Sequence, residues 1–222
     1  AGALLSYLSD TQKNSLQHIT AIKPYQTQSS MILDISTRRN LELTETIRGK
    51  TKKGSLLWLL DKTNTAMGGR VVRQWIQQPL ISSPLIIERL DGVEELFKNP
   101  IAMEELRLNL RRIYDLERLI GRISYGNANA RDIISLKQSL AMLPQIKQVL
   151  AQFKSNILSG FYNEMDLLED VFQLIEDSIS ENPPITLREG SIMNDGYDDQ
   201  LDKYRLAMTK GKDWLAELEK KE

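Results

Sequence analysis

The sequence predicts a mainly α-helical fold with a minor β element near the N-terminus. Three observations lead to this prediction. From Ser55 onward, apolar residues recur at steps of three and four, which is the spacing of one face of a helix. Prolines and asparagines divide this stretch into segments of helical length. The last segment carries a heptad pattern, which is typical of a long helix that pairs with another helix.

The first fifty residues give weaker signals than the rest of the chain. Apolar residues at positions 4–8 indicate an opening helix. Residues 19–25 and 31–33 read as two short extended segments, which we expect to form a small sheet. Asp34 or Ser36 can cap a short helix that begins near Thr37. The glycines and lysines of the following residues 49–54 then indicate a loop.

Prolines mark the helices in the middle of the chain. Pro84 suits the first turn of a helix that runs to about Lys98. Asn99 and Pro100 separate this helix from a helix at residues 101–113. Asp115 can cap the helix that follows.

The next two helices follow from their apolar faces. A long helix begins after the turn at residues 127–129, and Pro144 predicts a kink or a break within it. Another amphipathic helix has its apolar face at Met165, Leu168, Phe172 and Ile175. The prolines at positions 183 and 184 end it.

Two adjacent glycines, Gly68 and Gly69, lie inside a helix that Asp61, Thr63 or Asn64 can cap and that Pro79 ends. Each glycine costs about 1 kcal/mol relative to alanine in a helix, so the missing side chains need a reason. The spacing fits no phosphate-binding loop. We therefore favour close packing over phosphate binding, and we expect Arg70 to make a polar contact.

Several segments resemble the MutS family of DNA mismatch repair proteins. The most specific are LLWLLDKTNTAMGGR at residues 56–70 and WIQQPL at residues 75–80. Four others occur in the family's order and extend the resemblance over nearly the whole chain: TRRNLEL at 37–43, IIERLDGVEEL at 86–96, DLERLIGRI at 115–123 and REGSIMNDGYD at 188–198.

This resemblance implies a piece of a larger protein. Residues 1–193 would be the core domain, with the first residues at the junction to a connector domain. Residues 194–222 would be an outgoing lever helix that stops before a clamp domain. The intact protein would bind mismatched double-stranded DNA, form a homodimer, and hydrolyse ATP with Mg²⁺ in a separate ATPase domain. This piece would couple the ATPase domain to the clamp, without a catalytic residue, cofactor or metal of its own.

The last helix should start near Asp198 or Asp199, after a turn at residues 194–196. Its heptad seam comprises Leu201, Tyr204, Met208, Gly211, Leu215 and Leu218. A seam this narrow pairs with one other helix rather than with a broad core. We expect it to find a partner in another copy of the chain or on the core itself.

Composition sets limits on function. The 222 residues carry a net charge of −1 and no cysteine, which excludes disulfides and thiolate metal sites and leaves little overall attraction for DNA. No apolar run is long enough to cross a membrane, and we expect a cytoplasmic protein. Arg48, Lys50, Lys52 and Lys53 are weak candidates for phosphate contacts, but a solvated loop is the favoured interpretation.

The remaining candidate groups indicate no catalysis. His18, the only histidine, has no role assigned to it. The aspartates at positions 195, 198, 199 and 202 lack the spacing of a calcium loop and read as charges at a helix start. Arg111 or Arg112 can pair with Asp115 or with nearby acids. Two alternatives remain open, a DNA-independent helical scaffold and an enzyme with an unrecognised site.

Overall fold

The computed structural model describes residues 2–11 and 30–219, and these form a chain of helices without a sheet. The predicted mainly helical fold is therefore confirmed. The helices are α1 (Gly2–Thr11), α2 (Ile35–Asn40), α3 (Leu56–Leu60), α4 (Ala66–Gln77), α5 (Ser83–Lys98), α6 (Pro100–Leu110), α7 (Leu116–Ser124), α8 (Ala130–Leu140), α9 (Leu143–Leu150), α10 (Asn156–Glu164), α11 (Glu169–Ser178) and α12 (Asp199–Glu219). A short 3-10 helix lies at Leu187–Glu189.

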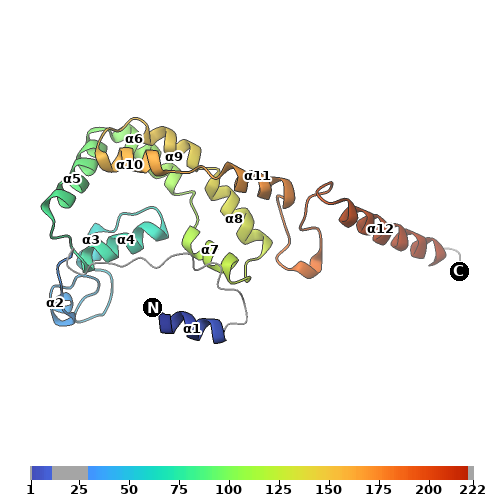
Figure 1. Ribbon diagram of the computed structural model, residues 1–222, viewed down its shortest axis with the longest axis horizontal. Coiled ribbons are helices and arrows are strands. Elements are labelled where there is room, and N and C mark those ends of the chain that lie inside the picture. The colour runs from blue at the N-terminus through green and yellow to red at the C-terminus, as the bar shows by residue number, and fades with distance from the viewer. Residues whose placement is uncertain (1, 12–29, 220–222) are drawn as a thin grey trace.

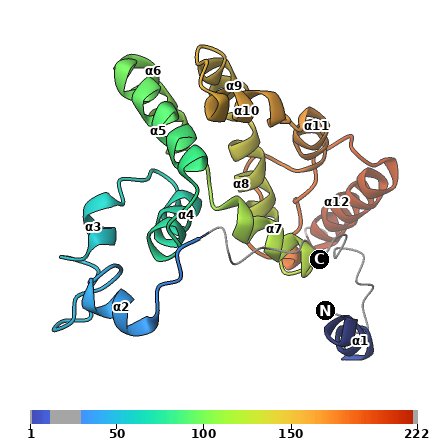
Figure 2. The ribbon, with the colours of Figure 1, turned by 60° about the vertical axis from the view of Figure 1, so that its left-hand side comes forward.

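The arrangement is elongated (Figure 1). Helices α5, α6, α9 and α10 lie together at one end, and α12 leads away from the other helices at the opposite end. The second view shows α7 and α8 in the middle of the molecule (Figure 2). The helices that pack directly are α3 with α4, α5 with α6, α6 with α9, α9 with α10, α10 with α5, α7 with α8, and α8 with α11.

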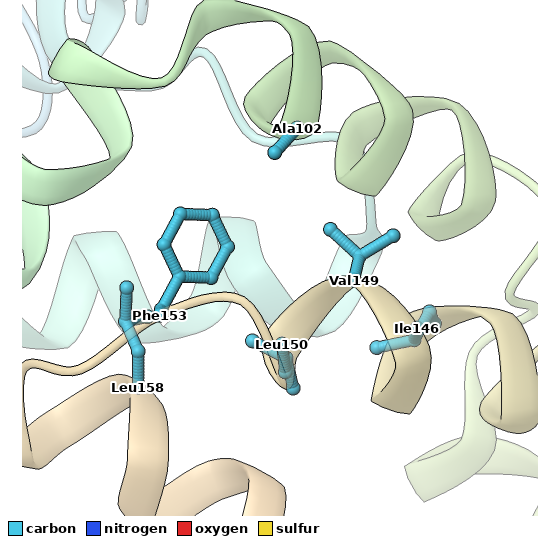
Figure 3. Close-up of a cluster of buried hydrophobic side chains, with 6 residues drawn as sticks. All are labelled: Ala102, Ile146, Val149, Leu150, Phe153 and Leu158. Carbon is cyan, nitrogen blue, oxygen red and sulfur yellow. The ribbon is translucent and has the colours of Figure 1, made fainter.

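The buried core lies between α6, α9 and α10. Val149 and Phe153 point toward the helix that carries Ala102, and Leu158 approaches from α10 (Figure 3). Ile146 and Leu150 complete this cluster on α9. Burial of these side chains removes apolar surface from water. This stabilises the folded chain by about 25 cal/mol for each Å² buried.

Local sequence signals explain most helix starts. The carboxylate of Asp34 accepts a hydrogen bond from the Thr37 amide, and the hydroxyl of Ser55 accepts one from the Trp58 amide. Asn129 and Asp132 form a reciprocal capping box at the start of α8. Pro144 coincides with the predicted break, because α8 ends at Leu140 and α9 begins at Leu143.

The expected N-terminal sheet is the main correction to the predicted fold. Its first segment, residues 19–25, lies outside the described residues. At the edge of its second segment, residues 31–33, Ser30 forms one antiparallel bridge with Leu80, and the Met31 amide donates to the Pro79 carbonyl at 2.8 Å. Proline has no N–H to extend a ladder, so the pairing ends there.

Two further corrections concern α10 and α11. Helix α10 was not predicted at all, and the helix expected from Met165 begins only at Glu169. Leu168 adopts a left-handed conformation with φ of 51°, and its amide donates to the Asp166 carboxylate at 3.0 Å. This turn separates α10 from α11 and prevents one continuous helix.

A candidate junction site around Arg70

The polar contacts around α4 begin in the loop that precedes it. Thr65 caps the helix, since its hydroxyl accepts a hydrogen bond from the Gly68 amide at 3.0 Å. The predicted caps Asp61 and Thr63 bond to each other instead, with the Thr63 hydroxyl donating to the Asp61 carboxylate at 2.6 Å. Lys52 also donates to Asp61, at 2.5 Å. The hydrogen bonds from Lys52 and Thr63 lower the pKa of Asp61 to about 2.

The two glycines face this same loop. A β-carbon on Gly68 would lie 3.1 Å from the Thr65 hydroxyl oxygen and 3.2 Å from the Thr63 β-carbon. A β-carbon on Gly69 would lie no closer than 3.5 Å to the Thr63 hydroxyl oxygen. Only Gly68 is therefore in a tight position, and the surface that approaches it is the helix's own N-terminal loop.

Arg70 joins α4 to the start of α7. Its Nη1 and Nη2 atoms donate to the two carboxylate oxygens of Asp115 at 2.8 and 2.6 Å, and its Nε donates to Glu117 at 2.8 Å. Asp115 is also the N-cap of α7, with its carboxylate accepting from the Arg118 amide at 3.4 Å. We call Arg70, Asp115 and Glu117 the Arg70 clasp.

The clasp is a strong type of polar contact. Two parallel hydrogen bonds from a guanidinium group to a carboxylate group fix the relative orientation of the two side chains as well as their distance. The hydrogen bonds from Arg70 hold the pKa of Asp115 below its usual range, and the two acids raise that of Arg70. The Asp115 side chain is 18% exposed and that of Glu117 is 65% exposed, so Asp115 contributes more of the interaction.

A second contact supports the clasp. The Arg111 side chain donates to the Asn64 amide oxygen at 3.1 Å and lies 3.8 Å from Glu104. The predicted pairing of Arg111 with a nearby acid is therefore confirmed with Glu104, whereas Asp115 itself pairs with Arg70 and Arg118. Helix α4 and the loop before it are thus held to the segment between α6 and α7 at two points.

The base of α12 is fixed by a separate arginine. The Arg205 guanidinium donates to the Met193 carbonyl at 2.8 Å and to the Asp195 carboxylate at 2.5 Å. Asp202 accepts from the Gly196 amide, and Asp198 caps the helix through the Gln200 and Leu201 amides. These aspartates therefore form turn and helix-start contacts, and the described residues contain no cluster that could hold a metal ion.

The other sequence candidates are spread along the chain. Lys52 is engaged with Asp61, while Arg48, Lys50 and Lys53 are exposed in the loop between α2 and α3. Of the seam residues, Leu201 is half-buried, whereas Tyr204 and Met208 are 68% and 67% exposed. The side chains of Leu215 and Leu218, and His18 as a whole, lie outside the described part of the structure.

The partners of Arg70 on α4 and of Arg205 on α12 were not predicted from the sequence. The partners of Arg70 lie 45 and 47 residues away, and no local pattern signals them. Arg205 follows Asp202 at the i, i+3 spacing, which is a visible signal for an ion pair on a helix.

Comparison with known proteins assigns the family. The model of MutS domain III matches residues 36–222. A DNA mismatch repair protein MutS from Lachnoclostridium phytofermentans is 54% identical over all 222 residues, and the one from Alkaliphilus oremlandii is 52% identical over the same length. The MutS of Bacillus subtilis is 49% identical over 219 residues, or 99% of this chain. The chain spans about a quarter of the length of these relatives, covering 24%, 25% and 26% of them. The chain therefore belongs to the MutS domain III family.

Proposed function

We propose that this chain is the core and lever of a MutS-type mismatch repair protein and that it couples an ATPase domain to a DNA clamp. ATP and Mg²⁺ would bind in the ATPase domain of the intact homodimer, and mismatched double-stranded DNA would be its ligand. In this proposal the connector, clamp and ATPase domains are the partners of the chain.

The anchoring of α12 carries the proposal. The contacts of Arg205 with Met193 and Asp195 attach the first two turns of the helix to the preceding turn. On the side that these contacts leave open, Tyr204, Leu206 and Met208 are exposed and available to a second helix. A long element held at one end transmits a rotation of its base to its far end.

The Arg70 clasp supports the same function from the other end of the core. It ties α4 to α7, and α7 packs on α8, which packs on α11. A displacement of α4 would therefore pass through packed helices toward the base of α12. Packed helices change between discrete arrangements rather than deforming continuously, which suits them to this coupling.

The test measures the lever angle in the full-length protein that contains this sequence. Spin labels at Gln138 on α8 and Ala207 on α12 would report the distance between core and lever by pulsed electron resonance. We expect this distance to differ between the ATP-bound and ADP-bound protein. The Arg70→Met variant should reduce the difference while ATP hydrolysis continues, and Arg118→Met, which removes a more exposed guanidinium, should not. Equal distances in both nucleotide states would refute the coupling.

A further inference from the structure

The chain from α10 to the turn after α11 carries many acidic residues and no basic one. Between Lys154 and Arg188 the sequence has no lysine or arginine, although the net charge of the whole chain is only −1. Seven exposed acidic residues lie in this stretch: Glu164, Asp166, Glu169, Asp170, Glu176, Asp177 and Glu181. Lys137 pairs with Glu176 at 2.6 Å, and the other six have no ion-pair partner among the described residues. We call this stretch the acidic surface.

An apolar hollow adjoins the acidic surface. Its volume is about 530 Å³, and it lies between α5, α6, α9 and α10. Leu106, Leu110 and Met165 form much of its wall, while Phe161 and Glu164 stand on its α10 side. Phe161 is 53% exposed, so one large apolar side chain at the hollow is open to a partner. The volume falls within the range of about 300–1,000 Å³ that is usual for binding pockets.

The charge of the surface decides between classes of partner. DNA and anionic lipid surfaces carry the same sign of charge, and the acidic residues would repel both. A protein segment with lysine or arginine beside apolar side chains has the complementary chemistry. Because helices border the hollow, an amphipathic helix with its anchors at i, i+3 or i+4 fits it best.

We propose that the hollow and the acidic surface form a docking site for a basic amphipathic helix of another protein. One aliphatic or aromatic side chain of that helix enters the hollow beside Phe161. Its lysines or arginines then lie near Glu164 and Asp166. This site is separate from the Arg70 clasp and from the exposed seam of α12, and it does not depend on the proposed coupling function.

Helix α12 of a second copy is the competing occupant. Residues 203–212 contain Lys203, Arg205, Lys210 and Lys212 and no acidic residue. Arg205, however, is already held by Met193 and Asp195 at the base of its own helix. A partner helix from a different protein meets the charge of the surface without breaking those contacts.

Fluorescence anisotropy with a designed peptide tests the site. The probe is a labelled helix of about 20 residues with leucines on one face and lysines elsewhere. One control peptide has the same composition with the apolar face scrambled, and another has glutamate in place of lysine. We expect the probe to bind the 222-residue chain at least about tenfold more tightly than either control. Equal binding of the scrambled peptide would mean that charge alone attracts the probe, which would overturn the proposal.

Substitutions locate the bound peptide. Phe161→Ser and Glu164→Lys should each weaken binding of the probe by about tenfold or more. The matched controls Tyr125→Ser and Glu45→Lys change the same kinds of exposed side chain elsewhere and should leave the affinity unchanged. Circular dichroism would verify that all four variants are folded. Unchanged affinity in both folded hollow variants would overturn the proposal.

Two further outcomes distinguish the competing partners. Sedimentation that shows a dimer of the chain, lost in Glu164→Lys, would assign the hollow to a second copy and overturn the proposed partner. Direct binding of a labelled short DNA duplex to the chain, lost in Phe161→Ser, would do the same in favour of nucleic acid. We expect Glu164→Lys to leave the oligomeric state of the chain unchanged, and we expect no binding of DNA at the hollow.

Discussion

A methyl group of Ile157 on α10 occupies the space that a side chain on Gly92 of α5 would need. A β-carbon built on Gly92 would lie 2.5 Å from Ile157 Cγ2, well inside van der Waals contact. Three residues further on, the carboxylate of Glu95 accepts hydrogen bonds from the Lys154 and Ser155 amides at 2.7 and 2.8 Å. Hydrogen bonds from Ser155 and Lys154 hold the pKa of Glu95 below its usual range. One face of α5 thus both receives α10 and holds the two residues that precede it.

Substitution of Gly92 by alanine should therefore destabilise the chain. Ile157 Cγ2 is attached directly to its β-carbon and cannot swing away on a flexible stem, so α5 and α10 must separate. We expect the free energy of unfolding to fall by about 1–3 kcal/mol, measured by urea denaturation. Gly160→Ala is the matched control, because a β-carbon there meets no atom within 4 Å. That variant should gain up to about 1 kcal/mol from higher helix propensity, and equal losses in both would contradict the packing argument.

The glycine pair of α4 should respond asymmetrically to alanine. Gly69→Ala adds a β-carbon at ordinary contact distance, so improved helix propensity should stabilise the chain by up to about 1 kcal/mol. Gly68→Ala should lose this gain, because Thr63 and Thr65 are fixed by their own hydrogen bonds and cannot move aside freely. Thermal melting compares the two variants. Similar melting temperatures would show that Gly68 is not a packing position.

A double-mutant cycle measures the Arg70 clasp. Arg70→Met and Asp115→Asn should each destabilise the chain, and their effects should overlap, with a coupling energy of about 1–2 kcal/mol. Arg70→Lys should recover only part of the loss, because an ammonium group cannot bond both carboxylate oxygens in the same geometry. Arg118→Met removes an exposed partner of Asp115 and should cost less than about 0.5 kcal/mol. Strictly additive effects of the first two substitutions would rule out the clasp.

Acid should weaken the loop around Asp61 within a defined pH window. The pKa of Asp61 is lowered from 3.8 to about 2 in the folded chain, so the unfolded chain binds the proton first as the pH falls. The stabilisation is fully present above about pH 5 and is lost as the pH falls through the folded pKa of about 2. At pH 6, Asp61→Asn should cost about 1 kcal/mol, after allowance for solvent around Lys52. Melting curves should show this difference shrinking toward pH 2, and a constant difference would exclude titration of Asp61 as the cause.

Local chemistry made many helix starts predictable from sequence. Asp34 and Asp115 were identified as caps because a short side-chain oxygen before an apolar-periodic stretch satisfies free amide groups of the first turn. Pro144 and the pair at residues 99–100 marked helix ends for equally local reasons. A helix boundary can therefore be predicted from sequence when the interaction that sets it lies within one helical turn.

Helix α10 shows why the rest escaped prediction. Its nine residues include Gly160, and no side chain within it caps its own start. The missing contribution comes from Glu95 and Gly92, about 60 residues earlier in the chain. The Arg70 clasp has the same character, because Asp115 is recognisable as a cap while its second partner is visible only in three dimensions.

Because α12 is attached only at its base among the described contacts, a small movement of that base becomes a larger movement of its far end. At 1.5 Å per residue, the 21 residues of this helix span about 30 Å. A tilt of about 10° about the first residue of the helix would carry the far end sideways by about 5 Å, roughly one helical turn. A change as small as the exchange of one hydrogen-bond partner of Arg205 is thus magnified at Glu219 into a movement comparable to the spacing between side chains.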